Sequence, residues 1–183
     1  MRQYEKTIKT EEIYNGKIVK LRVDDVELPD GTFSKREIVT HQGAVAVLAV
    51  KNGQMFFVKQ YRIASQRLLT EIPAGLLEPG ETPEEAAIRE CREEIGYRPI
   101  DLFKLGEFIP TPGYCSEKIT LFCATDFSWD PLEEDEDEFI SVIKIPLRTA
   151  RALFINGKFI DGKTVAALGY YFTITTRGFC KNK

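Results

Sequence analysis

The sequence predicts an α/β (α+β) fold, a sandwich with a mixed β-sheet between helices, preceded by a small N-terminal antiparallel β hairpin. Strand-like segments lie on both sides of one well-marked helix, and two further helical segments follow them. Strands and helices do not alternate as repeated βαβ units, so an all-parallel sheet is not expected. The 183 residues are 43% hydrophobic, which suffices for one domain with a core and a small appendage.

The predicted strands are separated by recognisable turns. Residues 17–28 and 34–40 form the expected hairpin around Pro29-Asp30-Gly31. Asn52-Gly53 is a hairpin turn between a buried strand at 44–50 and the strand QMFFVKQYR. The remaining expected elements are strands at 102–109, 118–125 and 139–145, and helices at 147–155 and 163–173.

The best-marked helix starts at Thr82, which suits an N-cap. Glu85 completes a capping box, and Gly96 can end the helix. At about 100° per residue, one face carries apolar side chains and the opposite face carries three carboxylates. The apolar face holds Ala87, Ile88, Cys91 and Ile95, and the acidic face holds Glu90, Glu93 and Glu94.

The acidic face predicts a divalent metal site. A solvated surface is the alternative, but Glu90 and Glu94 are like charges at i,i+4, a spacing that destabilises a helix by itself. A bound cation would compensate for the repulsion, and carboxylate oxygens suit Mg²⁺ or Mn²⁺.

The stretch from Gly75 to Tyr97 resembles the Nudix box, a glycine loop and helix with metal-binding glutamates. The seven fixed letters of the box are Gly75, Glu81, Arg89, Glu90, Glu93, Glu94 and Gly96. A chance match at a given start is on the order of one in 10⁸ at average composition. Cys91 and Tyr97 replace the usual aliphatic residues, and neither position carries charge or ligation in the pattern.

The Nudix resemblance implies the α/β/α sandwich and a metal-dependent attack of water on a pyrophosphate. It implies that Glu90 and Glu94 are the main metal ligands, with Glu93 and the carbonyl of Ala74 beside them. Arg89 is expected to orient the glutamates rather than to touch substrate.

Further segments resemble bacterial ADP-ribose pyrophosphatases over nearly the whole chain, among them KREIVTHQGAVAVLAV, LTEIPAGLLEPGE and PTPGYCSEKITLF. Pro112, beside Gly113, stands fifteen residues after Tyr97, an offset associated with that subfamily, although proline and glycine are common in any loop. The resemblance implies a homodimer, with residues 1–42 as a dimerising appendage and residues 43–183 as the Nudix domain.

The same resemblance assigns substrate contacts. It implies that Arg36 and Glu37 meet the adenosine end, that Arg62 contacts a phosphate or ribose, and that Glu117 approaches the terminal ribose. An exposed strand residue is the alternative for Arg36.

The acidic segment at 133–138 has two interpretations. Its composition is typical of a solvated loop. The resemblance implies that one of its glutamates is the general base or a further metal ligand, with Glu136 the first choice and Glu138 the second.

Composition limits the classes of binding partner and the cellular location that are expected. The net charge of −3 argues against nucleic-acid binding, and no apolar run suggests a signal peptide or a membrane span, so a cytoplasmic protein is expected. The four cysteines lack the CxxC spacing of metal sites and are interpreted as reduced thiols, with Cys91 and Cys123 in the core. His41 is expected to have a structural role.

Three functions are therefore considered. The first is Mg²⁺-dependent cleavage of ADP-ribose to AMP and ribose 5-phosphate. The second is hydrolysis of other nucleoside diphosphate sugars or of dinucleotides such as NADH and FAD. The third is a catalytically silent module that senses ADP-ribose, which the complete set of box glutamates disfavours.

Overall fold

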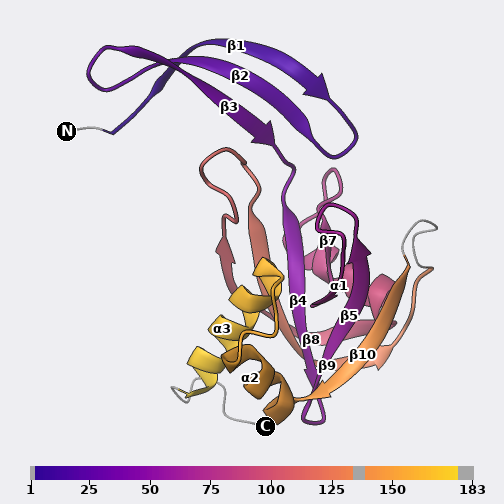
Figure 1. Cartoon of the computed structure of the whole chain (residues 1–183). Helices are drawn as coiled ribbons and strands as arrows, with labels where there is room; N and C mark the ends of the chain where they lie inside the picture. Colours follow the sequence, from indigo (N-terminus) through magenta and orange to yellow (C-terminus); the bar gives the residue numbers. More distant parts are fainter. Residues whose placement is uncertain (1–2, 134–138, 177–183) are drawn as a thin grey trace. The chain divides into compact units, whose positions relative to one another are not determined.

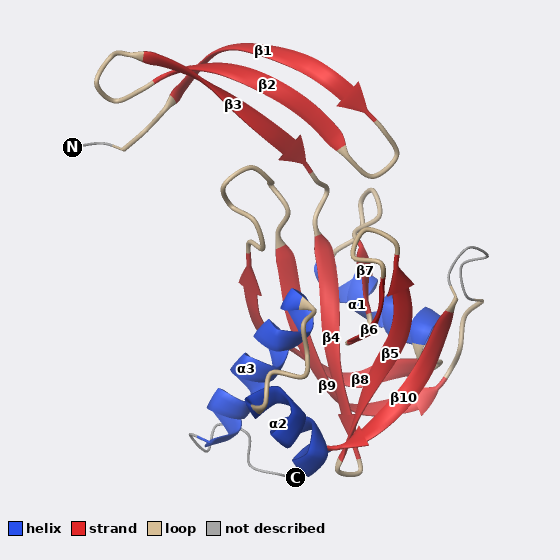
Figure 2. Ribbon diagram, viewed as in Figure 1, coloured by secondary structure: helices blue, strands red, loops and turns tan. Residues whose placement is uncertain are grey.

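The computed structural model describes residues 3–133 and 139–176, drawn along the chain in Figure 1 and by secondary structure in Figure 2. The chain forms two compact units. The first unit comprises Met1–Gly43 and Ile109–Lys118, and the second comprises Ala44–Phe108 and Ile119–Lys183.

The first unit contains a three-stranded antiparallel sheet with the order β1-β2-β3. Its strands are β1 (Lys6–Asn15), β2 (Lys20–Glu27) and β3 (Phe33–Thr40). Strands β2 and β3 are the predicted hairpin, and Gly31 in its turn has a φ of 84°. Strand β1 was not predicted, and its addition corrects the hairpin to a three-stranded sheet. All ten residues of β1 are exposed, so no alternation of buried and exposed positions marks it in the sequence.

The segment at 109–118 belongs to the first unit because it bonds to the end of β3. Val39 N donates a hydrogen bond to Tyr114 O at 2.8 Å, and Ser116 N donates to Val39 O at 2.9 Å. His41 N then donates to Ser116 Oγ at 3.0 Å. These bonds tie the segment to the residues that lead out of β3.

The second unit is built on a seven-stranded mixed sheet with the order β10-β5-β4-β9-β8, in which β6 pairs with β5 and β7 pairs with β4. Strands β4 and β9 are parallel and the other pairs are antiparallel. Its strands are β4 (Ala44–Lys51), β5 (Gln54–Arg62), β6 (Arg67–Glu71), β7 (Ala74–Leu76), β8 (Tyr97–Phe108), β9 (Ile119–Trp129) and β10 (Ile140–Pro146). Its helices are α1 (Pro83–Glu94), α2 (Leu147–Ile155) and α3 (Gly162–Thr176).

Both faces of this sheet are covered by helices (Figure 2). Successive residues of β4 alternate between two hydrophobic clusters, which explains why the strand reads as a continuous apolar run. Ala46 and Leu48 join the cluster that contains Leu168 of α3, whereas Val45 and Val47 join the one that contains Ala87 of α1. The predicted sandwich with a mixed sheet is confirmed.

Local signals located most elements correctly. Asn52 and Gly53 have φ values of 52° and 71°, as the predicted hairpin turn between β4 and β5 requires. Strand β8 starts at Tyr97, whereas the sequence predicted a start at residue 102. The prediction was wrong because Pro99 interrupts the strand pattern, but β8 lies at the edge of the sheet, where a proline is tolerated. The short strands β6 and β7 were not predicted. In the part of the chain that the structure describes, no helix combines the length and apolar character needed to cross a membrane.

Candidate functional site

Helix α1 begins with the predicted capping box. Thr82 Oγ1 accepts a hydrogen bond from Glu85 N at 3.3 Å, and Thr82 N donates to Glu85 Oε2 at 2.9 Å. Gly96 follows the C-cap Ile95 with a φ of 76°, a conformation that favours glycine. The chain therefore enters and leaves this helix at fixed positions.

The acidic face of α1 is covered rather than solvated. Glu90 is 7% exposed and Glu94 is 4% exposed, whereas Glu93 is half-buried. Ala74 N donates a hydrogen bond to Glu94 Oε2 at 3.0 Å. A Cβ added to Gly75 would lie 1.9 Å from Glu90 Oε1, so this carboxylate occupies the space that only a glycine leaves free. The loop glycine and two of the glutamates thus form one packed unit.

Arg89 connects the glycine loop to the helix glutamates. Its Nε and Nη2 donate to the Glu81 carboxylate at 2.9 and 3.0 Å, and Nη2 also donates to Leu76 O at 2.9 Å. Its Nη1 donates to Glu90 Oε1 at 2.6 Å and to Glu93 Oε2 at 2.9 Å. The hydrogen bonds to Glu81 raise the pKa of Arg89, burial opposes them, and the nearby carboxylates raise it further. The guanidinium therefore bonds to the glycine loop and to two glutamates of α1 at once.

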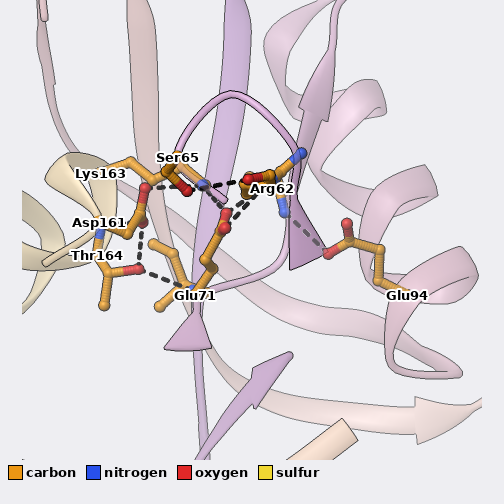
Figure 3. A network of polar contacts seen from close by, with 9 residues as sticks. Arg62, Ser65, Glu71, Glu94, Asp161, Lys163 and Thr164 are labelled. Carbon is orange, nitrogen blue, oxygen red and sulfur yellow. Dashed lines mark hydrogen bonds and ion pairs between the residues drawn. The ribbon is translucent and has the colours of Figure 1, made fainter. Parts of the chain in front are cut away.

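A second arginine lies near the same glutamates. Arg62, at the end of β5, donates two hydrogen bonds to Glu71, from Nε at 2.9 Å and from Nη2 at 2.8 Å (Figure 3). Hydrogen bonding to Glu71 raises the pKa of Arg62 although burial lowers it, and the charge of Glu94 contributes to the rise. Arg62 and the acidic face of α1 therefore lie within electrostatic reach of each other.

The donor atoms on this face suit a hard divalent cation. Glu90, Glu93 and Glu94 offer carboxylate oxygens, and Ala74 offers a carbonyl oxygen. In residues 3–133 and 139–176, no three acidic, histidine or cysteine side chains converge on one point in the observed conformation. Glu90 and Glu93 instead face Arg89, which holds them on the same side of α1.

Five of the predicted substrate residues belong to the first unit. Arg36 Nε and Nη2 donate to Glu5 at 2.9 and 2.6 Å. Glu37 is exposed and follows Arg36 directly in β3, so the two side chains point to opposite faces of the sheet. The other three residues of this group lie on the segment at 109–118, and they are Pro112, Gly113 and Glu117.

That segment contains a turn followed by a carboxylate. Tyr114 N and Cys115 N both donate to Thr111 O, at 3.3 and 3.0 Å, which closes a turn around Pro112 and Gly113. Glu117 Oε1 lies 3.8 Å from His41 Nδ1. Glu136 and Glu138, the candidate bases, lie outside the described residues.

The sequence analysis missed the partners of Arg62. Glu71 is 1% exposed and also contacts Lys163 Nζ, which pairs with Asp161. One signal was available, since Glu71 lies inside the largely apolar segment LLTEI, where a carboxylate is unusual. Its partner Lys163 comes 92 residues later, and no local pattern joins the two.

Two family models cover most of the chain. The NUDIX domain model matches residues 39–167, and the nucleoside diphosphate sugar hydrolase N-terminal domain model matches residues 5–39. The chain belongs to the Nudix family. Members of this family generally need divalent metal ions, in agreement with the oxygen donors gathered on α1.

Individual relatives agree with this Nudix assignment. The chain is 47% identical to an ADP-ribose pyrophosphatase of Bacillus subtilis (strain 168) over 169 residues, which is 91% of each chain. It is 46% identical, over the same shares, to a methanol dehydrogenase activator of Bacillus methanolicus. A solved structure of an ADP compounds hydrolase superposes with a TM-score of 0.87 and 25% identity, covering 97% of this chain and 98% of that one. The Nudix resemblance and the fold expected from the sequence are both confirmed.

Proposed function

We propose that this Nudix protein is a Mg²⁺-dependent hydrolase that adds water to the pyrophosphate of ADP-ribose and releases AMP and ribose 5-phosphate. The observation that carries the proposal is the 47% identity to a Bacillus subtilis ADP-ribose pyrophosphatase along 91% of both chains. The site geometry supports it, because a buried acidic face and two arginines lie on one unit.

Residues of α1 and β7 bind the metal in this proposal. Glu90 and Glu94 are the main ligands, Glu93 adds a third carboxylate, and the carbonyl of Ala74 adds a backbone oxygen. When bound, Mg²⁺ neutralises the pyrophosphate and lowers the pKa of the attacking water. Arg89 keeps two of these carboxylates oriented through its hydrogen bonds to Glu90 and Glu93.

The substrate contacts in this proposal are the ones that the family resemblance implies. Arg62 donates to a pyrophosphate oxygen, for which a guanidinium is well suited. Arg36 and Glu37 recognise the adenosine end, although their side chains point to opposite faces of β3. The turn at Pro112 and Gly113 and the carboxylate of Glu117 recognise the terminal ribose.

A loop glutamate accepts the proton of the attacking water. Glu136 is the first candidate and Glu138 the second. A carboxylate near bound cations has a lowered pKa, so it accepts the proton through a positioned water molecule.

We also propose that the protein is a homodimer formed through residues 1–42. Apolar side chains of the first unit are more than half exposed, which is typical of a surface that another chain covers. They are Tyr4, Ile8, Ile13, Tyr14, Ile18 and Phe33. Sedimentation of the parent protein and of an Ile13→Glu variant tests the proposal. A dimer that the variant weakens is expected, and a monomeric parent would refute it.

A second candidate function follows from the Bacillus methanolicus relative, whose name describes activation of a methanol dehydrogenase. In that case the physiological effect would be a faster dehydrogenase reaction. Hydrolysis of other nucleoside diphosphate sugars, NADH or FAD, and silent ADP-ribose sensing, are the remaining alternatives.

A substrate panel separates these functions. The purified protein with Mg²⁺ is assayed against ADP-ribose, ADP-glucose, NADH, FAD and a dinucleoside polyphosphate, and kcat/KM is compared. A preference for ADP-ribose with release of AMP is expected. A preference for another compound would refute the substrate assignment, and tight binding without cleavage would indicate a sensor. The same protein added to an alcohol dehydrogenase assay tests the activator function.

A further inference from the structure

A buried carboxylate outside the acidic face of α1 has no role in the reaction described so far. Glu71 ends β6 with 1% of its surface exposed. It accepts two hydrogen bonds from Arg62 and one from Lys163 Nζ, so two cations from distant parts of the chain share it (Figure 3). Burial by itself raises the pKa of Glu71, but the hydrogen bonds and charges of Arg62 and Lys163 outweigh it, and the pKa is lowered.

The first turn of α3 holds this cluster in place. Asp161 Oδ2 accepts hydrogen bonds from Thr164 N at 3.0 Å and from Thr164 Oγ1 at 2.6 Å, while Asp161 Oδ1 accepts from Lys163 Nζ at 3.1 Å. Thr164 Oγ1 in turn accepts from Ile72 N at 2.9 Å in a buried position. Asp161 therefore fixes Lys163, and Thr164 fixes the backbone that directly follows Glu71.

The same stretch of backbone continues to the candidate metal ligands. Pro73 O accepts a hydrogen bond from β4 at 2.8 Å, and Ala74 N donates to Glu94 Oε2 at 3.0 Å. Residues 71–74 thus hold Arg62 at one end and Glu94 at the other. The contribution of Glu94 to the raised pKa of Arg62 is consistent with this proximity.

Stability alone does not account for a charged cluster here. Burying a carboxylate is costly, and apolar residues of similar volume often stabilise a protein as well as a buried ion pair does. Arg62 has five N–H donors, and the bidentate pair uses two of them. Its side chain is 41% exposed, so the remaining donors are accessible while Glu71 fixes the plane of the guanidinium.

We propose that Glu71 is a positioning residue for substrate binding: it holds the guanidinium of Arg62 beside Glu94, so that the remaining N–H groups of Arg62 meet the pyrophosphate. Lys163 continues to neutralise the charge of the buried Glu71 carboxylate when Arg62 also donates hydrogen bonds to the ligand. The inference rests on the proposed function, because it takes a pyrophosphate as the ligand of this site.

A double-mutant cycle on kcat/KM for ADP-ribose tests whether Glu71 acts through Arg62. The variants are Glu71→Gln, Arg62→Met and the double variant. Each single change is expected to lower kcat/KM by about 10- to 100-fold, the range of one charge-assisted hydrogen bond. The double variant is expected to match Arg62→Met, because Glu71 has no further effect once the guanidinium is gone. Effects that multiply would overturn the proposal, since a purely structural carboxylate acts whether or not Arg62 is present.

A control removes an ion pair elsewhere in the same unit. Asp126 pairs with Lys51 at 3.1 Å, and Lys51 lies opposite Gln54, at the other end of β5 from Arg62. Asp126→Asn is expected to keep the parent kcat/KM. If Glu71→Gln does not fold, Lys163→Met takes its place in the cycle, with a smaller single effect and the same loss of effect in the Arg62→Met background.

Binding separates this inference from the proposed function. Calorimetric Kd values for ADP-ribose, measured with EDTA to prevent turnover, are expected to follow the same cycle as kcat/KM. A parent protein that binds ADP-ribose without hydrolysing it would overturn the proposed function alone, and the Kd cycle would then decide the role of Glu71. A parent that does neither would overturn both.

Discussion

Adding one methyl group at Gly75 should displace Glu90, a proposed metal ligand, without changing any charge. In Gly75→Ala the new Cβ would lie 1.9 Å from Glu90 Oε1 and 2.1 Å from Glu90 Cδ. Ordinary contact begins at 3.4 Å, so the carboxylate must retreat by about 1.5 Å, the difference between 3.4 and 1.9 Å. Glu90 is buried and bonded to Arg89, so it cannot make this movement freely.

The expected loss follows from that displacement. A misplacement of about 1 Å in a reacting site can lower the rate by about 100-fold, and kcat/KM for ADP-ribose should fall by about that factor. The Mg²⁺ concentration at half-maximal rate should rise, because a displaced ligand binds the ion less well. Overpacking should also cost about 1–3 kcal/mol of unfolding free energy, which urea denaturation without metal measures.

Gly162→Ala is the matched control. No atom lies within 4 Å of a Cβ at Gly162, so the same methyl group should leave both the rate and the Mg²⁺ requirement unchanged. The reasoning is refuted if folded Gly75→Ala protein keeps kcat and half-saturating Mg²⁺ within about threefold of the parent.

Three further predictions concern the same helix. Glu94→Gln should lower kcat by at least about 100-fold and abolish the rise of Tm expected for the parent with Mg²⁺, because a proposed ligand is lost; near-full turnover would contradict the metal assignment. Hydrogen bonding to Arg89 lowers the pKa of Glu81. The Glu81–Arg89 pair should therefore stabilise the folded protein fully at pH values above 4.5, the ordinary pKa of a glutamate, and this contribution should disappear as the pH falls through the lowered pKa. In Arg89→Met, the unfolding free energy measured with urea should not show this decrease at low pH. A pH dependence equal to that of the parent would contradict the pairing. Thr82→Ala should cost about 1 kcal/mol, measured by thermal unfolding, since it removes the cap; an unchanged Tm would show that the cap does not stabilise the helix.

Features that depend on neighbouring residues could be predicted from the sequence. The capping box of Thr82 and Glu85 and the turn at Asn52-Gly53 are local interactions, and the structure contains both. The alternation of β4 between two hydrophobic clusters follows from its position inside a sandwich, which its apolar run indicated. The Nudix box placed the acidic helix face correctly because its spacing coincides with helical periodicity.

Features that depend on distant residues could not be predicted. Strand β1 has no buried position, so hydrophobic patterning contains no trace of it. The sequence predicted that Glu90 and Glu94 share one face of α1, but it did not predict that both side chains are buried beside residues 74–76. The pairing of Glu71 with Lys163 spans 92 residues, and only the folded sheet brings the end of β6 next to the start of α3.

The assignment of residues 109–118 to the first unit affects how the protein is made on the ribosome. Strands β1 to β3 are synthesised early, but the backbone of Val39 obtains its partners only when Tyr114 and Ser116 emerge. At about 5–20 residues per second, these partners are synthesised roughly 4–15 s after the end of β3, and α1 is completed in that interval. The first unit therefore cannot be completed until Ala44–Phe108 of the second unit has been synthesised. A gene shortened to begin at residue 44 would leave the later segment without its strand partner, whatever the length of the remaining domain.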